Sequence, residues 1–343
     1  MTDAYAAAGV SFEAGDAVID RISGAVKSTH DERVVAGLGS FGGVFDLASL
    51  SELNQPLLVA STDGVGTKTK LSAAMDLWEG AGGDIVNHGI NDVLVQGAQP
   101  LFFLDTVAAS NLDPSIVGRI VSGMAAACRE AGCVLLGGET AEMPDVFVEG
   151  AVDIAGTMVG AVSRDRLLPK VGIEAGQVLV GIASNGLHTN GYSLARRIAA
   201  DFDLNSPVPG GDGTSIGAAL CAVHRSYLPV LNEAIEADLI MALAHITGGG
   251  LIDNVPRVLP AGVGARIDVA SWPRPALFEW LITAGDVDET EAHRIFNCGI
   301  GMVVIVQPDQ VQQFQQSIGE PSWLIGETIA VDGPSVVELT GVG

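Results

Sequence analysis

The fold is decided by the stretch Pro56-Leu-Leu-Val-Ala-Ser-Thr-Asp-Gly-Val-Gly-Thr-Lys-Thr-Lys-Leu71, in which an apolar run gives way abruptly to polar residues and glycines. The run at residues 57–60 predicts a short buried strand. A Gly-Val-Gly turn follows the polar residues, and a helix is predicted to begin near Lys68. A strand, a glycine loop and a helix in this order indicate a layered α/β protein with a site at the end of the strand.

The polar half of this stretch has the chemistry of a phosphate site. Glycines allow backbone N–H groups to approach an anion, a helix N-terminus favours negative charge, and Lys68 adds positive charge. Asp63 stands beside the loop and could hold a metal ion that phosphates also bind. The P-loop pattern is excluded, because no glycine stands five residues before a Gly-Lys-Ser/Thr sequence. A plain turn beside a solvated lysine remains the alternative.

Length and composition limit the classes of protein that fit this chain. A chain of 343 residues suggests about two domains, and 48% hydrophobic with 17% charged residues indicates a compact protein. A net charge of −24 argues against nucleic-acid or anionic-membrane partners. We expect no membrane span, no signal peptide and four reduced cysteines, and hence a cytoplasmic protein.

A second glycine cluster lies ahead of the first stretch. Gly37, Gly39 and Gly42 match G-x-G-x-x-G, and Asp63 follows about twenty residues later, which is the pattern of a nicotinamide-dinucleotide site. However, residues 34–36 make a poor strand, and Asp63 precedes a glycine loop of its own. We therefore favour a mobile glycine lid over a ligand at residues 37–43, with a dinucleotide-binding oxidoreductase as the open alternative.

Carboxylates recur where buried strands are predicted to end. The apolar runs at residues 101–104 and 133–136 are followed by Asp105 and Glu139, as residues 57–60 are followed by Asp63. A helix predicted at residues 84–97 places His88 and Asp92 on one face. Carboxylates from several elements suit Mg²⁺ bound with substrate phosphates. Unrelated surface acids are the alternative.

The second half of the chain offers two polar loops. Residues 163–176 predict a linker, and the buried strand predicted at 178–183 leads into a loop at 184–191 that should offer His188, Thr189 and Asn190 to solvent. His188 is a possible proton carrier near neutral pH. Thr247 and the three glycines after it predict a second anion site.

Several motifs together resemble one family, the aminoimidazole ribonucleotide synthetases, also called phosphoribosylformylglycinamidine cyclo-ligases. The most specific is Gly137-Gly-Glu-Thr-Ala-Glu-Met-Pro144, and the others extend in the same order over nearly the whole chain. They are Thr62-Asp-Gly-Val-Gly-Thr-Lys68, Pro100-Leu-Phe-Phe-Leu-Asp105, Leu187-His-Thr-Asn-Gly-Tyr-Ser-Leu194, His245-Ile-Thr-Gly-Gly-Gly250 and Phe296-Asn-Cys-Gly299, together with Gly37-Leu-Gly39, Asn91-Asp92 and Val95-Gln-Gly-Ala98.

The resemblance implies an ATP-dependent ring closure in purine biosynthesis. Formylglycinamidine ribonucleotide would be phosphorylated on its formyl oxygen and would close to aminoimidazole ribonucleotide, releasing ADP and phosphate. The resemblance further implies a homodimer with no nucleic-acid or membrane partner. Its fold would be an ATP-dependent synthetase fold of α/β (α+β) class. Residues 1–165 would form an ATP-binding and dimerisation domain with a ferredoxin-like, half-barrel sheet, and residues 166–343 an α/β substrate-binding domain.

The resemblance also assigns roles to individual residues. Asp63, Lys68 and His188 would be catalytic, and Asp63, Asp92 and Glu139 would bind Mg²⁺. The ATP-binding residues would be Lys27, Gly37, Gly39, Gly42, Gly43, Gly64, Gly66, Thr67, Lys68 and Asp92. The substrate-binding residues would be Ser61, Thr62, His188, Thr189, Asn190, Gly191, Thr247, Gly248 and Gly249.

Three stretches depart from the family pattern, namely residues 30–33, 87–89 and 145–147. At residues 87–89 the chain has Asn-His-Gly, where the family usually carries small or sulfur-containing apolar residues. These departures affect the expected ATP pocket and lid. Selenophosphate synthetase, thiamine-phosphate kinase, a hydrogenase maturation factor and the preceding amidine-forming enzyme share the architecture, and a nucleotide-binding regulator without turnover is a further alternative.

Overall fold

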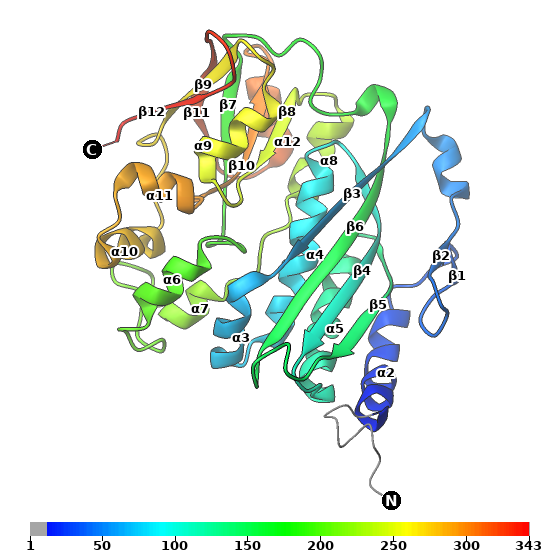
Figure 1. Ribbon diagram of the computed structural model, residues 1–343. Helices are drawn as coiled ribbons and strands as arrows, with labels where there is room; N and C mark the ends of the chain where they lie inside the picture. The colour runs from blue at the N-terminus through cyan, green and yellow to red at the C-terminus, as the bar shows by residue number, and fades with distance from the viewer. Residues whose placement is uncertain (1–11, 343) are drawn as a thin grey trace, which may run out of the picture. The chain divides into compact units, whose positions relative to one another are not determined.

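The computed structural model describes residues 12–342 and divides into two compact units. Unit 1 contains Met1–Val93 and Ala98–Asp165, and unit 2 contains Leu94–Gly97 and Arg166–Gly343. Each unit combines a sheet with helices (Figure 1), which confirms the predicted α/β class. Residues 1–11 of the expected N-terminal domain lie outside the described residues. Among residues 12–342, the helices are too short or too polar to span a membrane.

Unit 1 is built on a four-stranded sheet with the order β3-β6-β4-β5. Strands β4 and β5 run parallel, and β6 runs antiparallel to both of its neighbours, so β3 and β4 point the same way. The strands are β3 (Pro56–Gly64), β4 (Gln99–Ala109), β5 (Val134–Glu142) and β6 (Val152–Ser163).

Helices α4 (Trp78–Leu94) and α5 (Pro114–Glu130) cover one face of this sheet, which we call the helical face (Figure 1). Helix α5 begins with a capped first turn: Asp113 accepts hydrogen bonds from the backbone N–H groups of Ser115 and Ile116, and a proline occupies the first turn. Phe103 of β4 is fully buried on this face. Its ring fills the space that a side chain at Gly156 of β6 would occupy, and Met158 of β6 fills the space at Gly89 of α4.

Two glycines bring α4 and α5 into very close contact. A Cβ atom at Gly82 of α4 would overlap the carbonyl oxygen of Ile120 of α5. In return, a Cβ atom at Gly123 of α5 would overlap the carbonyl oxygen of Glu79 of α4. The backbones of the two helices therefore touch without intervening side chains, which fixes the position of α4 on the sheet.

The opposite face of the sheet, the open face, keeps apolar side chains exposed. Leu58 of β3 is 61% exposed. Phe102 points to this face, because it neighbours Phe103 on a strand, and its ring lies 5.3 Å from that of Phe45. Phe45 belongs to a small hairpin. The remaining elements of unit 1 are β1 (Val34–Ala36), β2 (Val44–Phe45), α2 (Phe12–Lys27), η1 (Ala48–Glu52), η2 (Gly66–Lys68) and α3 (Thr69–Met75), with η3 (Arg164–Arg166) at the boundary.

The predicted strand ends in unit 1 were too early. Ser61, Thr62 and Asp63 continue β3, where they pair with residues of β6, and Asp105 and Glu139 also lie inside their strands. The prediction failed because the strands continue through polar positions that a local apolar run does not mark. The extent of β3 and β4 is set by pairing with β6, almost a hundred residues away from β3 along the chain, and that of β5 by pairing with β4.

Unit 2 contains a six-stranded sheet with the order β12-β9-β11-β7-β10-β8. Its pairings are antiparallel except for that between β12 and β9. Strand β10 is buried along its whole length at the centre of the core. The strands are β7 (Val178–Ala183), β8 (Ala242–His245), β9 (Val263–Asp268), β10 (Ile300–Val306), β11 (Ser322–Ala330) and β12 (Val337–Thr340).

The helices of unit 2 lie between these strands in the sequence (Figure 1). Short loops connect most of them, and the polar segment at residues 184–191 joins β7 to α6. The helices are α6 (Tyr192–Ala199), α7 (Ile216–Leu220), α8 (Leu228–Glu236), α9 (Gly250–Asn254), η4 (Val255–Val258), α10 (Ala276–Gly285), α11 (Glu289–Ile295) and α12 (Val311–Ile318).

Candidate active site

Polar side chains meet on the helical face of unit 1, between β3 and α4. His88 Nε2 lies 3.0 Å from Asp63 Oδ2 and 3.5 Å from Asp92 Oδ2. The hydroxyl of Ser61 donates a hydrogen bond of 2.8 Å to Asp92 Oδ2. The strand supplies Ser61 and Asp63 two residues apart on one face, and the helix supplies His88 and Asp92 four residues apart on one face. We call these four residues the acidic cluster.

The acidic cluster holds a cation between two carboxylates. Burial alone would lower the pKa of His88, but hydrogen bonds to Asp63 and Asp92 outweigh it and raise this pKa to about 9. The hydrogen bond from His88 holds the pKa of Asp63 below its usual value. Asp63 remains 47% exposed. The cluster therefore presents carboxylate and hydroxyl oxygens to solvent around a buried imidazolium.

Lys68 does not take the position that the sequence predicted for it. Its side chain is fully buried, and Nζ lies 2.8 Å from Oδ1 of Asp84, which is also fully buried. A lysine in this position cannot reach a phosphate in solvent, so its assignment as a catalytic and ATP-binding residue is corrected to a buried ion pair. Asp84 was missed, because it is sixteen residues away and reads as one acid in an apolar helix.

Glu139 is separated from the acidic cluster by the sheet. The register places Asp63 and Asp105 on either side of Gly156, so both carboxylates belong to the helical face. Glu139 pairs with Thr106, the next residue, and lies on the open face. The structure therefore does not bring Glu139 together with Asp63 and Asp92 as a shared metal site.

Asp105 is a candidate that the predicted site omitted. It is 8% exposed, and its carboxylate occupies the space that a side chain at Gly138 would fill. Burial raises the pKa of Asp105 to about 7, with a smaller contribution from Glu139. The sequence placed this residue at a strand end, but did not indicate that the sheet sets it in one row with Asp63.

The predicted glycine lid also lies away from the acidic cluster. Residues 37–43 connect β1 to β2, and Phe45 of β2 packs on the open face against Phe102. A Cβ atom at Gly43 would overlap the side chain of Leu136, and one at Gly37 would lie 2.6 Å from the ring of His30. Lys27 is exposed at the end of α2. Within one chain, Gly37, Gly39, Gly42 and Gly43 therefore do not cover Asp63 and Asp92.

The loop after β3 does lie beside the acidic cluster. Oδ1 of Asp63 accepts a hydrogen bond of 2.7 Å from the N–H of Gly64. Gly66 has a φ of +64°, a conformation that favours glycine, and Gly66 and Thr67 are exposed where η2 begins. Thr62 points to the open face, and its hydroxyl donates to the carbonyl oxygen of Gly156.

In unit 2 the two predicted substrate loops lie together. A Cβ atom at Gly248 would lie 3.1 Å from Oδ1 of Asn190. Asn254 organises the second loop, since its side-chain amide donates to the carbonyl oxygens of Thr247, Gly248 and Gly250. In the first loop, Thr189, Asn190 and Gly191 are half-buried, and in the second Thr247 and Gly249 are half-buried while Gly248 is exposed.

His188 is buried and not offered to solvent, so that expectation was wrong. Its side chain is 1% exposed, and its backbone has a φ of +63°. The ring stacks on that of His224 at 4.1 Å and fills the space above Gly301. Neither His224 nor Gly301 is near His188 in the sequence, which is why the loop pattern could not predict this burial.

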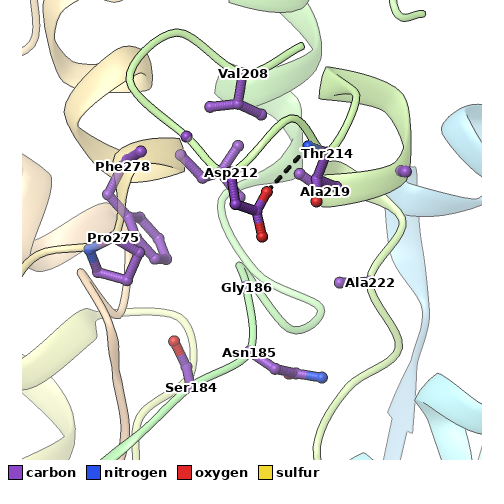
Figure 2. Close-up of a pocket in the computed structure, with 14 residues that line it drawn as sticks. Ser184, Asn185, Gly186, Val208, Asp212, Thr214, Ala219, Ala222, Pro275 and Phe278 are labelled. Atoms are coloured by element: carbon purple, nitrogen blue, oxygen red, sulfur yellow. Dashed lines mark hydrogen bonds between the residues drawn. The ribbon is translucent and has the colours of Figure 1, made fainter.

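A pocket of about 460 Å³ opens next to the first substrate loop (Figure 2). It lies between residues 184–186, the segment around Asp212 and the start of α10. Asp212 accepts a backbone hydrogen bond from Thr214. No motif in residues 205–214 indicated this pocket. The lining is formed by Ser184, Asn185, Gly186, Val208, Gly211, Asp212, Thr214, Ala218, Ala219, Ala222, Pro275, Ala276, Leu277 and Phe278.

Two family profiles match this chain. The profile "AIR synthase related protein, N-terminal domain" matches residues 45–162, and "AIR synthase related protein, C-terminal domain" matches residues 174–338. A phosphoribosylformylglycinamidine cyclo-ligase of Bifidobacterium animalis subsp. lactis is 45% identical over 335 residues, which cover 96% of this chain and 97% of that protein. One of Nitrosospira multiformis is 45% identical over 327 residues, with 94% and 92% covered.

Solved structures share the fold at low sequence identity. Thiamine-monophosphate kinase from Stenotrophomonas maltophilia has a TM-score of 0.68 at 18% identity and covers 95% of this chain and 96% of its own. HypE of E. coli has a TM-score of 0.67 at 21% identity, with 94% of both chains covered. The hydrogenase maturation protein HypE in complex with ATP has a TM-score of 0.61 at 19% identity, covering 96% of this chain and 91% of that one.

Proposed function

This chain belongs to the phosphoribosylformylglycinamidine cyclo-ligase family, and from this premise we propose that it closes the imidazole ring with ATP bound at the acidic cluster of unit 1. Its reaction is the cyclisation of formylglycinamidine ribonucleotide to aminoimidazole ribonucleotide in purine biosynthesis. The proposal for ATP rests on the convergence of Asp63, Asp92 and Ser61 beside an exposed glycine loop. An ATP complex of HypE, which shares the fold, supports it.

We propose two chemical steps. The formyl oxygen of the substrate attacks the γ-phosphorus of ATP, an oxygen–phosphorus bond forms, and ADP leaves with the electrons of the bond that breaks. The amine nitrogen then attacks the activated carbon, the carbon–nitrogen bond of the ring forms, and phosphate leaves as the carbon–oxygen bond breaks. The nitrogen gives up a proton in this second step. Phosphoryl transfer of this kind depends mainly on positioning and charge stabilisation.

The acidic cluster fits a divalent cation that binds with ATP. Mg²⁺ prefers a few carboxylate oxygens together with phosphates and water, and Asp63 and Asp92 supply such oxygens on the helical face. When bound, Mg²⁺ would offset the negative charge of the phosphates. Ser61 orients Asp92 through its hydrogen bond, and His88 holds Asp63 and Asp92 in place. The N–H groups of the loop at Gly66 and Thr67 would face the phosphates.

The substrate ribonucleotide would bind in unit 2. Thr189, Asn190 and Gly191 on one loop, and Thr247, Gly248 and Gly249 on the other, lie together and expose polar atoms. His188 would position the first of these loops, since its ring is buried beneath it.

Four buried thiols fit the reducing cytoplasm, which we propose as the location.

The test of this function follows both products. Purified protein with ATP, Mg²⁺ and formylglycinamidine ribonucleotide should release ADP and aminoimidazole ribonucleotide in equal amounts. Asp63→Asn should lower kcat/KM by at least about 100-fold, because it removes a carboxylate that would hold the divalent cation at the phosphates. Asp20→Asn on exposed α2 is the matched control and should retain full activity. ADP without the imidazole product, or an active Asp63→Asn variant, would contradict the proposal.

We also propose that the chain forms a homodimer through the open face of the unit 1 sheet. This face exposes Leu58 at 61%, and the hairpin that packs on it through Phe45 exposes Val44 at 49%, which is unfavourable in water. Pairing these faces would bury both residues and would bring Glu139 and the glycine lid to the interface. Leu58→Glu should convert a dimer into a monomer in light scattering. Ile19→Glu, at a similarly exposed site on α2, should remain dimeric.

A further inference from the structure

Three histidine side chains converge in the interior of unit 2. His188 follows β7, His245 ends β8, and His224 lies in the segment between α7 and α8. They are 1%, 6% and 0% exposed, respectively. One ring nitrogen from each lies within 4.8 Å of one from each of the others. We call these residues the histidine cluster and propose that it binds a divalent transition-metal ion such as Zn²⁺, Co²⁺ or Ni²⁺.

The distances within the histidine cluster suit such an ion. His224 Nε2 and His245 Nε2 lie 3.0 Å apart. Two nitrogens that bind a tetrahedral metal ion at 2.0–2.1 Å are about 3.3 Å apart, so this pair needs little movement. The ring of His188 stacks on that of His224 with centroids 4.1 Å apart, and it must turn and move a nitrogen by at most about 1.5 Å to reach the same spacing.

The protonation of the histidine cluster also favours a metal ion. A nitrogen–nitrogen contact of 3.0 Å requires that one ring donates a proton and the other accepts it. The pair therefore contains at least one neutral imidazole, which is the form that binds metals. The ligand type excludes Mg²⁺ as the preferred ion, because Mg²⁺ selects oxygen ligands whereas imidazole suits Zn²⁺, Co²⁺ and Ni²⁺.

Hydrogen bonds from neighbouring groups hold the histidine rings in place. Thr189 Oγ1 lies 3.4 Å from His224 Nδ1, on the side of the ring away from His245. The hydroxyl of Tyr192 donates to the backbone oxygen of His188. Partners of this kind orient histidine ligands in metal proteins. A bound ion would join the loop that carries His188 to the end of β8, directly before the second substrate loop.

The experiment measures metal binding without nucleotide or substrate. Untagged protein freed of metal is titrated with Zn²⁺ against a chromophoric chelator, and with Co²⁺ while visible absorption is recorded. We expect one Zn²⁺ per chain and an absorption band typical of tetrahedral Co²⁺. His224→Gln should weaken Zn²⁺ binding by at least about 100-fold. His293→Gln, at another buried histidine of unit 2, should bind as the unchanged protein does.

Two further measurements keep the result unambiguous. Circular dichroism and melting without metal establish that His224→Gln is folded, and His245→Gln serves as the second variant if it is not. Asp63→Asn should keep its Zn²⁺, because Asp63 is not one of the three proposed ligands. The proposal is overturned if the unchanged protein binds no stoichiometric Zn²⁺, if His224→Gln binds equally well, or if Asp63→Asn loses the ion. None of these results depends on whether the acidic cluster binds ATP.

Discussion

In unit 1 the buried ammonium of Lys68 is bonded to the carboxylate of Asp84, whereas in unit 2 the buried ring of His293 has no hydrogen-bond partner among the described residues. The same contrast separates two histidines. His88 is 3% exposed and lies between two carboxylates, which raise its pKa to about 9. His293 is 1% exposed, and burial lowers its pKa to about 4, assisted by the charge of Arg274. The hydrogen-bonding partner, and not the burial, therefore decides whether a buried histidine is protonated or neutral.

The ion pair in unit 1 should give the largest effect. Asp84→Ala leaves the ammonium of Lys68 buried without its carboxylate, and should lower the free energy of unfolding by about 3–5 kcal/mol. The double variant Lys68→Met with Asp84→Leu should lose much less, because no charge is left unpaired. Urea unfolding of unit 1, followed by hydrogen exchange, measures the free energy of unfolding of the single and the double variant. Equal losses in the single and double variants would show that packing, not charge, sets the effect.

The unpartnered ring in unit 2 should make this unit sensitive to acid. The unfolded chain takes up a proton at His293 near pH 6.5, whereas the folded chain does so only near pH 4. The unfolded state thus binds more protons between these values, so the free energy of unfolding falls as the pH falls, by about 3 kcal/mol in total. His293→Leu should remove this part of the pH profile.

Tryptophan fluorescence follows this prediction, since Trp272, Trp280 and Trp323 belong to unit 2 and Trp78 to unit 1. The difference in unfolding free energy between the two proteins is measured from pH 4 to pH 8. It should be nearly constant above pH 7 and should change steadily below pH 6.5. A difference that does not depend on pH would mean that the pKa of His293 is the same in the folded and unfolded states.

The smallest effect is expected at His88, where the partners themselves are candidates for metal binding. His88→Leu removes a positive charge from between Asp63 and Asp92, so Mg²⁺ should bind about tenfold more tightly. Calorimetric titration with Mg²⁺ alone measures this, and His293→Leu is the control. Weaker binding in His88→Leu would show instead that His88 helps to hold the ion.

The order of strands and helices could be predicted from the sequence, whereas the partners and the burial of individual charged and titratable side chains could not. Asp113 and Pro114 marked the start of α5 because capping is local. Lys68 looked like a phosphate ligand, since its partner Asp84 is one acid in an apolar helix sixteen residues away. His188 looked exposed, because the rings that bury it come from residues 224 and 227 and from β8.

The same difference between local and long-range signals explains which of the predicted metal ligands lie together. Asp63 and Asp92 were predicted together and lie on one face, because each carries a local signal, a strand end and a helix face. Glu139 was added on equal grounds, yet one step of register puts it on the other side of the sheet. Only the pairing of β4 with β5 decides that step, and no local pattern reveals it.

The contact between Gly82 and Gly123 has a consequence for how this chain can vary. Any larger residue at either position must push α4 away from α5, and α4 carries His88 and Asp92. In a library of single-codon variants, these two codons should therefore tolerate almost no replacement. Temperature-sensitive alleles of the gene would be sought here, at two residues without a functional group of their own.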